Sequence, residues 1–165
     1  MKRLVGVAVT ALLSVSVCFT AFGAVSTNAS PWAAPHMEQA YSLQLISAPL
    51  LQQAQDTMTR VEFSEIAVAF YEKVTGTTAP MTEENPFSDC NEQAALKAYR
   101  LGIIAGVEPG TFAPENPLTR EQMAIMLVRT LEKVGVDMSL YAKKNPFTDT
   151  KNIGATTVSY IDKAY

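Results

Sequence analysis

The chain has 165 residues, which is enough for one ordinary domain or for two to three small repeats. It carries 13 basic and 16 acidic residues, a net charge of −3, which argues against nucleic acid or an anionic membrane as a partner, because both favour a basic face. The two cysteines are Cys18 and Cys90. If a leader containing Cys18 is removed, no internal disulfide can form, so burial of apolar side chains must stabilise the fold.

Residues 1–24 are predicted to be a secretory signal peptide. Lys2 and Arg3 precede an apolar run from Leu4 to Phe22, and small residues follow. An uncleaved membrane anchor is the alternative, because the run approaches the length of a membrane span. Cleavage lowers the basic count from 13 to 11 against 16 acids, a net charge of roughly −5. We then expect a secreted protein without membrane contact, in which residues 25–30 form a short linker.

A first unit is expected over residues 31–78. After Pro31 and Trp32, the segment 36–46 has helical character, and a loop over 47–57 follows. A second helix should begin at Thr59-Arg60, because Thr59 and Glu62 have the spacing of a capping box.

A second unit is expected over residues 79–140, because the same signals return. Thr119-Arg120 stands 60 positions after Thr59-Arg60, with Gln122 in the place of Glu62. Behind each capping box the apolar residues follow one helical face, which predicts a repeated core. The members of this face are Phe63, Ile66, Ala67, Tyr71 and Val74 in the first copy, and Met123, Met126, Leu127, Leu131 and Val134 in the second. In the glycine- and proline-rich loop before this helix, Phe112 is expected to pin the loop to the core.

The two arginines fall at the first position of their helices. There the unpaired backbone N–H groups and a guanidinium can converge on one anion. The alternative is that each arginine forms an ion pair with a nearby acid such as Asp89 or Glu62. The sequence leaves both interpretations open, and the repetition favours a ligand.

A third unit is expected to begin within residues 141–165. Asn145-Pro146-Phe147-Thr148-Asp149 repeats Asn85-Pro86-Phe87-Ser88-Asp89, and in each copy the phenylalanine is expected to be a buried anchor. Ala164-Tyr165 matches Ala98-Tyr99, so the sequence stops inside a first helix. We interpret the chain as two units and a truncated third.

The repeated sequence motifs together resemble the S-layer homology (SLH) repeat of bacterial surface proteins. The residues that carry the resemblance are Pro-Phe-Ser-Asp at 86–89, Ala-Tyr-x-Leu-Gly-Ile-Ile-x-Gly at 98–106, Gly-Thr-Phe-x-Pro at 110–114 and Leu-Thr-Arg-Glu-Gln at 118–122. The resemblance covers nearly all of 31–165 and is strongest in the second unit. It implies an all-α fold in which tandem helix-loop-helix repeats form an incomplete pseudo-threefold spindle.

The resemblance also implies a function without catalysis. Such repeats bind an acidic, often pyruvylated, secondary cell-wall polysaccharide and so anchor proteins to the bacterial wall. If the roles known for this family apply to the matching positions, Arg60 and Arg120 would bind the carboxylate of the acidic sugar. Asp89 and Gly106 would line the ligand groove, and Trp32 would offer a surface on which a sugar ring can stack. The sequence departs from the Thr-Arg-Ala-Glu motif at Val61 and at Glu121-Gln122.

Three other interpretations compete with anchoring. The chain could be a fragment that folds poorly and binds nothing, or two chains could associate through the incomplete third unit. An enzyme is the weakest of the three, because only His36 and Cys90 could form a nucleophilic pair and they lie far apart in sequence. No catalytic residue, metal site or cofactor is predicted.

Overall fold

The computed structural model describes residues 26–165, so the predicted signal peptide lies outside the described residues. Within this range the regular elements are helices without any β-strand, which confirms the all-α prediction. The α-helices are α1 (Ala34–Ser42), α2 (Ala48–Gln52), α3 (Arg60–Thr75), α4 (Gln93–Arg100), α5 (Arg120–Lys133) and α6 (Ala155–Ala164), with short 3-10 helices η1 (Met138–Leu140) and η2 (Thr150–Asn152) between the last two.

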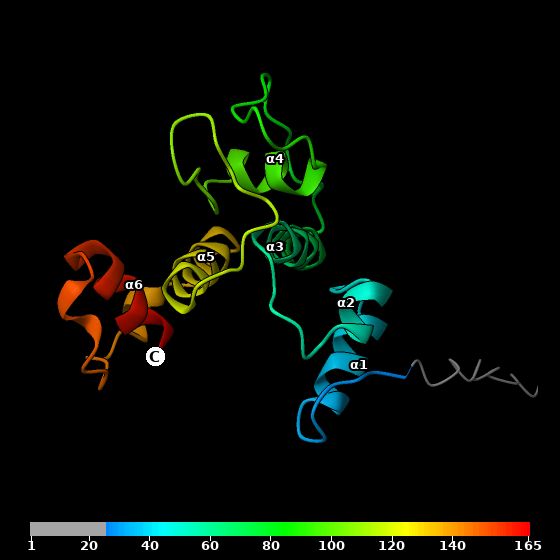
Figure 1. Cartoon of the computed structure of the whole chain (residues 1–165), viewed down its shortest axis with the longest axis horizontal. Coiled ribbons are helices and arrows are strands. Elements are labelled where there is room, and N and C mark those ends of the chain that lie inside the picture. Colours follow the sequence, from blue (N-terminus) through cyan, green and yellow to red (C-terminus); the bar gives the residue numbers. More distant parts are fainter. Residues whose placement is uncertain (1–25) are drawn as a thin grey trace, which may run out of the picture.

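The two longest helices, α3 and α5, form the middle of the molecule. They pack against each other, α4 packs on α3, and α6 packs on α5 (Figure 1). The pair α1 and α2 lies on the far side of α3 from α5 and α6 (Figure 1). This arrangement places the first turns of α3 and α5 next to segments that lie far from them in sequence.

The predicted capping boxes open both central helices. The Glu62 N–H donates to the Thr59 hydroxyl at 3.3 Å, and the Thr59 N–H donates to the Glu62 carboxylate at 2.7 Å. At α5 the corresponding distances between Thr119 and Gln122 are 3.3 and 3.2 Å. Two reciprocal bonds fix where each helix begins, and therefore put Arg60 and Arg120 at the first helical position.

The core lies between α3, α4 and the loop that precedes α5. Phe112 is fully buried there, which confirms that it pins this loop, and Phe87 contacts it with ring centroids 5.2 Å apart. The predicted core face of the central helices is only partly correct. Ala67 and Met126 are buried, whereas Val74, Met123 and Leu127 are 54, 37 and 42% exposed. The loop covers the first turn of α3 instead and buries a different set there: Arg60, Val61 and Ser64.

The first unit differs from its prediction. The expected helix over 36–46 ends at Ser42, and Gln44 has a left-handed backbone with φ of 59°. The expected loop over 47–57 contains the short helix α2, in which Pro49 stands in the first turn, where proline needs no N–H. Burial of Leu50 and Leu51 then holds this helix to the rest of the protein.

No helix within residues 26–165 is both long and apolar enough to cross a membrane.

Candidate functional site

The first turn of α3 is closed by the loop that precedes α5. The Arg60 N–H donates to the Asn116 carbonyl at 3.1 Å, and the Val61 N–H donates to the Pro114 carbonyl at 3.0 Å. A short antiparallel bridge between Thr59 and Pro117 continues this contact. The expectation that free N–H groups at this helix start would bind an anion is therefore wrong for α3, because loop carbonyls already occupy them.

The Arg60 side chain holds the same loop from inside. It is 5% exposed, its Nε donates to the Phe112 carbonyl and its Nη2 to the Ala105 carbonyl, both at 2.9 Å, and its guanidinium lies 4.8 Å from the Phe112 ring centroid. Burial lowers the pKa of Arg60, and the charge of Asp89 partly opposes this shift. Neither ion pair of the described residues includes Arg60, so its predicted alternative pairing with Asp89 or Glu62 is wrong.

Asp89 fixes the loop from the opposite side. Its two carboxylate oxygens accept the N–H groups of Phe112 and Ala113, each at 2.8 Å. These backbone bonds, that of Phe112 first, lower the pKa of Asp89. Arg60 and Asp89 thus bind the carbonyl and the amide of one residue, Phe112, and lock the loop between them.

A groove of about 220 Å³ opens beside the buried arginine. Arg60 and Gly106 line it from one side, and Gln122 and Arg129 line it from α5. The Nε and Nη2 nitrogens of Arg60 donate to loop carbonyls, but its Nη1 nitrogen has no hydrogen-bond partner among the described residues. This nitrogen is therefore available to donate to a ligand. The groove therefore brings two cationic side chains together with the predicted glycine.

Gly106 is required for the shape of this loop, and we expect Gly106→Ala to destabilise the protein. A Cβ built at this position would lie 2.7 Å from the Thr111 carbonyl oxygen and 2.8 Å from that of Glu108. Because backbone would have to shift, the expected loss in unfolding free energy is about 1–3 kcal/mol, measured by urea denaturation. Gly154→Ala is the matched control, since nothing lies within 4 Å of its Cβ. Equal effects of the two changes would contradict this account.

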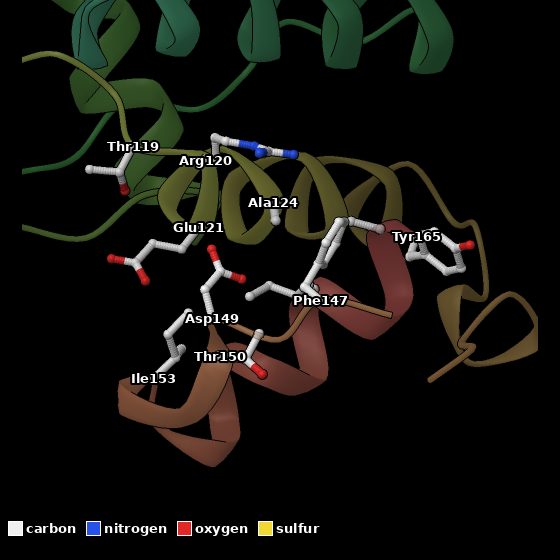
Figure 2. A pocket seen from close by; sticks show the side chains of 11 residues that line it. Thr119, Arg120, Glu121, Ala124, Phe147, Asp149, Thr150, Ile153 and Tyr165 are labelled. Atoms are coloured by element: carbon white, nitrogen blue, oxygen red, sulfur yellow. The ribbon is translucent and has the colours of Figure 1, made fainter. Parts of the chain in front are cut away.

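The first turn of α5 is open where that of α3 is closed. Arg120 is exposed and lines a pocket of about 510 Å³ between α5 and the segment 147–165 (Figure 2). Its guanidinium lies 5.7 Å from the Phe147 ring centroid, and Asp149 and Tyr165 complete the pocket with other side chains. Phe147 is 42% exposed, so the expectation that it would be a buried anchor is wrong: no loop of the described chain covers it as Phe112 covers Phe87.

Trp32 lies apart from both arginine sites. It is 79% exposed, in the turn that Ser30 closes by accepting the Ala33 N–H, and it lines neither the Arg60 groove nor the Arg120 pocket. Asp89 likewise faces the loop backbone and does not line the groove. Of the predicted site residues, Arg60 and Gly106 therefore line the same groove, whereas Arg120 lines a different pocket and Trp32 lines neither.

Sequence reasoning missed Arg129 and Asp149. Arg129 follows Gln122 by two helical turns, a spacing that places both on one face of α5, but no motif singles it out. Its Nε donates to the Tyr160 hydroxyl at 3.4 Å. Asp149 could have been predicted as a site residue, because it occupies the position of Asp89 in the second copy of the Asn-Pro-Phe-x-Asp motif.

Comparison with known proteins agrees with these motifs. Residues 88–124, which include Asp89, Gly106 and Arg120, match the family model of the S-layer homology domain. An endoglucanase of Bacillus sp. (strain KSM-635) is 28% identical over 88% of this chain, and an exoglucanase of Acetivibrio thermocellus is 31% identical over 62%. Cell surface glycoprotein 1 of A. thermocellus is 33% identical over 46%.

The matched stretches are small parts of these relatives. The chain covers 15% of the endoglucanase, 10% of the exoglucanase and 4% of the surface glycoprotein. No solved structure matches the chain significantly.

Proposed function

We propose that this protein is a non-covalent cell-surface anchoring module that binds an acidic, pyruvylated secondary cell-wall polysaccharide. The observation that carries the proposal is the cluster of Arg60, Gly106 and Arg129 in one groove; a separate pocket contains Arg120. The match to the S-layer homology domain and the similarity to a cell surface glycoprotein support the same function. The endoglucanase and the exoglucanase are named as enzymes, but this chain covers only 15 and 10% of their lengths. Their catalytic activities are therefore not part of this proposal.

The groove offers the chemistry that an acidic sugar requires. A carboxylate that accepts hydrogen bonds from Arg60 Nη1 and from Arg129 gains about 1.5–3 kcal/mol per bond. This local attraction prevails over the negative net charge of the chain, because salt screens charges beyond about 8 Å. A ligand that binds this guanidinium needs no free helix N–H groups.

The Arg120 pocket provides a second contact of a different character. Phe147 and Tyr165 offer apolar ring surface to a sugar, and the exposed Arg120 guanidinium offers charge. Glu121 and Asp149 line the same pocket and repel an anion. We therefore propose that the Arg60–Arg129 groove binds the polymer more tightly, and that the second contact adds avidity. An incomplete pseudo-threefold arrangement around α3 and α5 remains part of this proposal.

Binding to isolated cell walls tests the function. We expect the purified protein to co-sediment with walls that carry the acidic polymer, and Arg129→Gln or Arg120→Ala to weaken binding at least about tenfold, the effect of roughly 1.4 kcal/mol. Arg100→Ala is the matched control, because Arg100 is exposed and lines neither site. Thermal melts of each variant verify that it is folded. Unchanged binding by the Arg120→Ala, Arg129→Gln double variant would refute the proposal.

A further inference from the structure

Gln122 belongs both to the capping box of α5 and to the groove that Arg60 and Arg129 line. In the capping box, its Oε1 accepts the Thr119 N–H at 3.2 Å. A backbone N–H can donate only to the oxygen of a side-chain amide, so this bond fixes the orientation of the amide. The Nε2 nitrogen carries two N–H groups and has no hydrogen-bond partner within residues 26–165. Gln122 therefore brings to the groove a donor that the protein itself does not use.

The equivalent position of α3 shows that the capping box does not require an amide. There Glu62 takes the place of Gln122, and its Oε2 accepts the Thr59 N–H at 2.7 Å and the Thr59 hydroxyl at 2.9 Å. A carboxylate in the first turn also interacts favourably with the positive end of the helix dipole. Glutamate would thus cap α5 at least as well as glutamine does. Capping alone does not account for the amide at position 122.

The rest of the groove presents positive charge and hydrogen-bond donors. Arg60 and Arg129 line it, and no acidic side chain of the described residues does. The Ala105 carbonyl already accepts from Arg60 Nη2, so it is not free for a ligand. The remaining side chains on its walls are mainly large and apolar: Ile103, Ile104, Val107, Ile125 and Met126. A glutamate at position 122 would remove one donor, and its negative charge would compete with an anionic ligand for the two arginines.

We propose that Gln122 determines the specificity of this groove for an ionised acid. Its Nε2 donates to the same ligand carboxylate that accepts from Arg60 Nη1 and from Arg129. A carboxylate accepts at about four lone-pair sites and has no hydrogen of its own, so it can satisfy all three donors. A neutral amide in its place turns N–H groups toward these donors and binds more weakly. This inference rests on the proposed function and deepens it, because it names the residue that selects the charged form of the ligand.

The test exchanges the two capping residues, one at a time. Gln122→Glu keeps the capping box in the form that Glu62 has, but changes the donor in the groove to a charged acceptor. Co-sedimentation is measured with intact cell walls and with walls whose carboxylates have been converted to amides by carbodiimide and ammonium chloride. We expect Gln122→Glu to bind intact walls at least about tenfold more weakly, which corresponds to roughly 1.4 kcal/mol. It should bind amidated walls at least as well as the unchanged protein does, because its carboxylate accepts from an amide.

Glu62→Gln is the matched control, because it makes the reverse exchange at the same capping position, and Glu62 does not line the groove. It should leave binding to both wall preparations unchanged. Thermal melts of the two variants should show that each remains folded.

Two results would overturn the role of Gln122 alone. One is undiminished binding of Gln122→Glu to intact walls that Arg129→Gln binds weakly, which would leave the anchoring function in place. The other is an equal loss on intact and amidated walls, because general damage to the groove, and not a change in specificity, produces that pattern. If the unchanged protein does not bind intact walls, the proposed function fails, and the inference fails with it.

Discussion

Replacement of Arg60 by alanine is expected to destabilise the protein by about 3 kcal/mol or more, although arginine is usually a surface residue. The change removes two hydrogen bonds from a cation to the carbonyls of Phe112 and Ala105, and leaves the Phe112 ring without the guanidinium above it. Bonds to charged groups contribute about 1.5–3 kcal/mol each, and the buried carbonyls lose their partners. Urea denaturation measures the loss as a lower midpoint.

Arg120→Ala is the matched control, because it removes the same residue from the same helix position. Arg120 is exposed, and we expect this change to alter the unfolding free energy by less than about 0.5 kcal/mol. The pair of variants compares stability: we expect Arg60 to stabilise the fold through its buried contacts, and we expect exposed Arg120 to contribute little to it. Similar losses in both variants would show that the contrast between the closed and the open helix start is wrong.

Phe112→Ala should lower the unfolding free energy as much as Arg60→Ala does, but by a different mechanism. Phe112 is fully buried, contacts Phe87 and Arg60, and holds the backbone that Asp89 binds. Truncation of a buried phenylalanine costs about 3–5 kcal/mol through lost apolar burial and the cavity that remains. We expect a strongly lowered melting temperature and faster amide exchange over residues 105–117.

The control for this change is Phe147→Ala. Phe147 stands 60 positions after Phe87 but is 42% exposed, so its truncation should cost at most about 1–2 kcal/mol. If Phe147→Ala destabilised the protein as much as Phe112→Ala, the aromatic pocket at α5 would be a packed core and not an accessible surface.

Much of the fold could be predicted because it is encoded by local signals. Thr59 with Glu62 and Thr119 with Gln122 fix two helix starts through bonds within four residues, and both capping boxes form. The short helix α2 was missed because only five residues form it, and burial of Leu50 and Leu51 stabilises it more than its sequence pattern does. Periodicity also predicted a core at Met123 and Leu127, where the structure leaves more than a third of each side chain exposed.

The candidate site was harder to predict because its contacts join distant segments. The sequence identifies Arg60, Asp89 and Gly106 but not that the carbonyl and the N–H of Phe112 lie between the first two. Nor does it show that loop carbonyls occupy the first N–H groups of α3. The two Thr-Arg motifs are identical in sequence but have different environments, and only the fold distinguishes the buried Arg60 from the exposed Arg120.

The most direct test of surface anchoring is binding of the purified protein to two preparations of the same cell walls. One is intact, and the other has had its acidic secondary polymer removed by acid extraction. We expect saturable co-sedimentation with intact walls, reduced at high salt, and at least about tenfold weaker binding to extracted walls. Equal binding to both preparations would contradict the claim that arginine-lined grooves bind an acidic sugar of the wall.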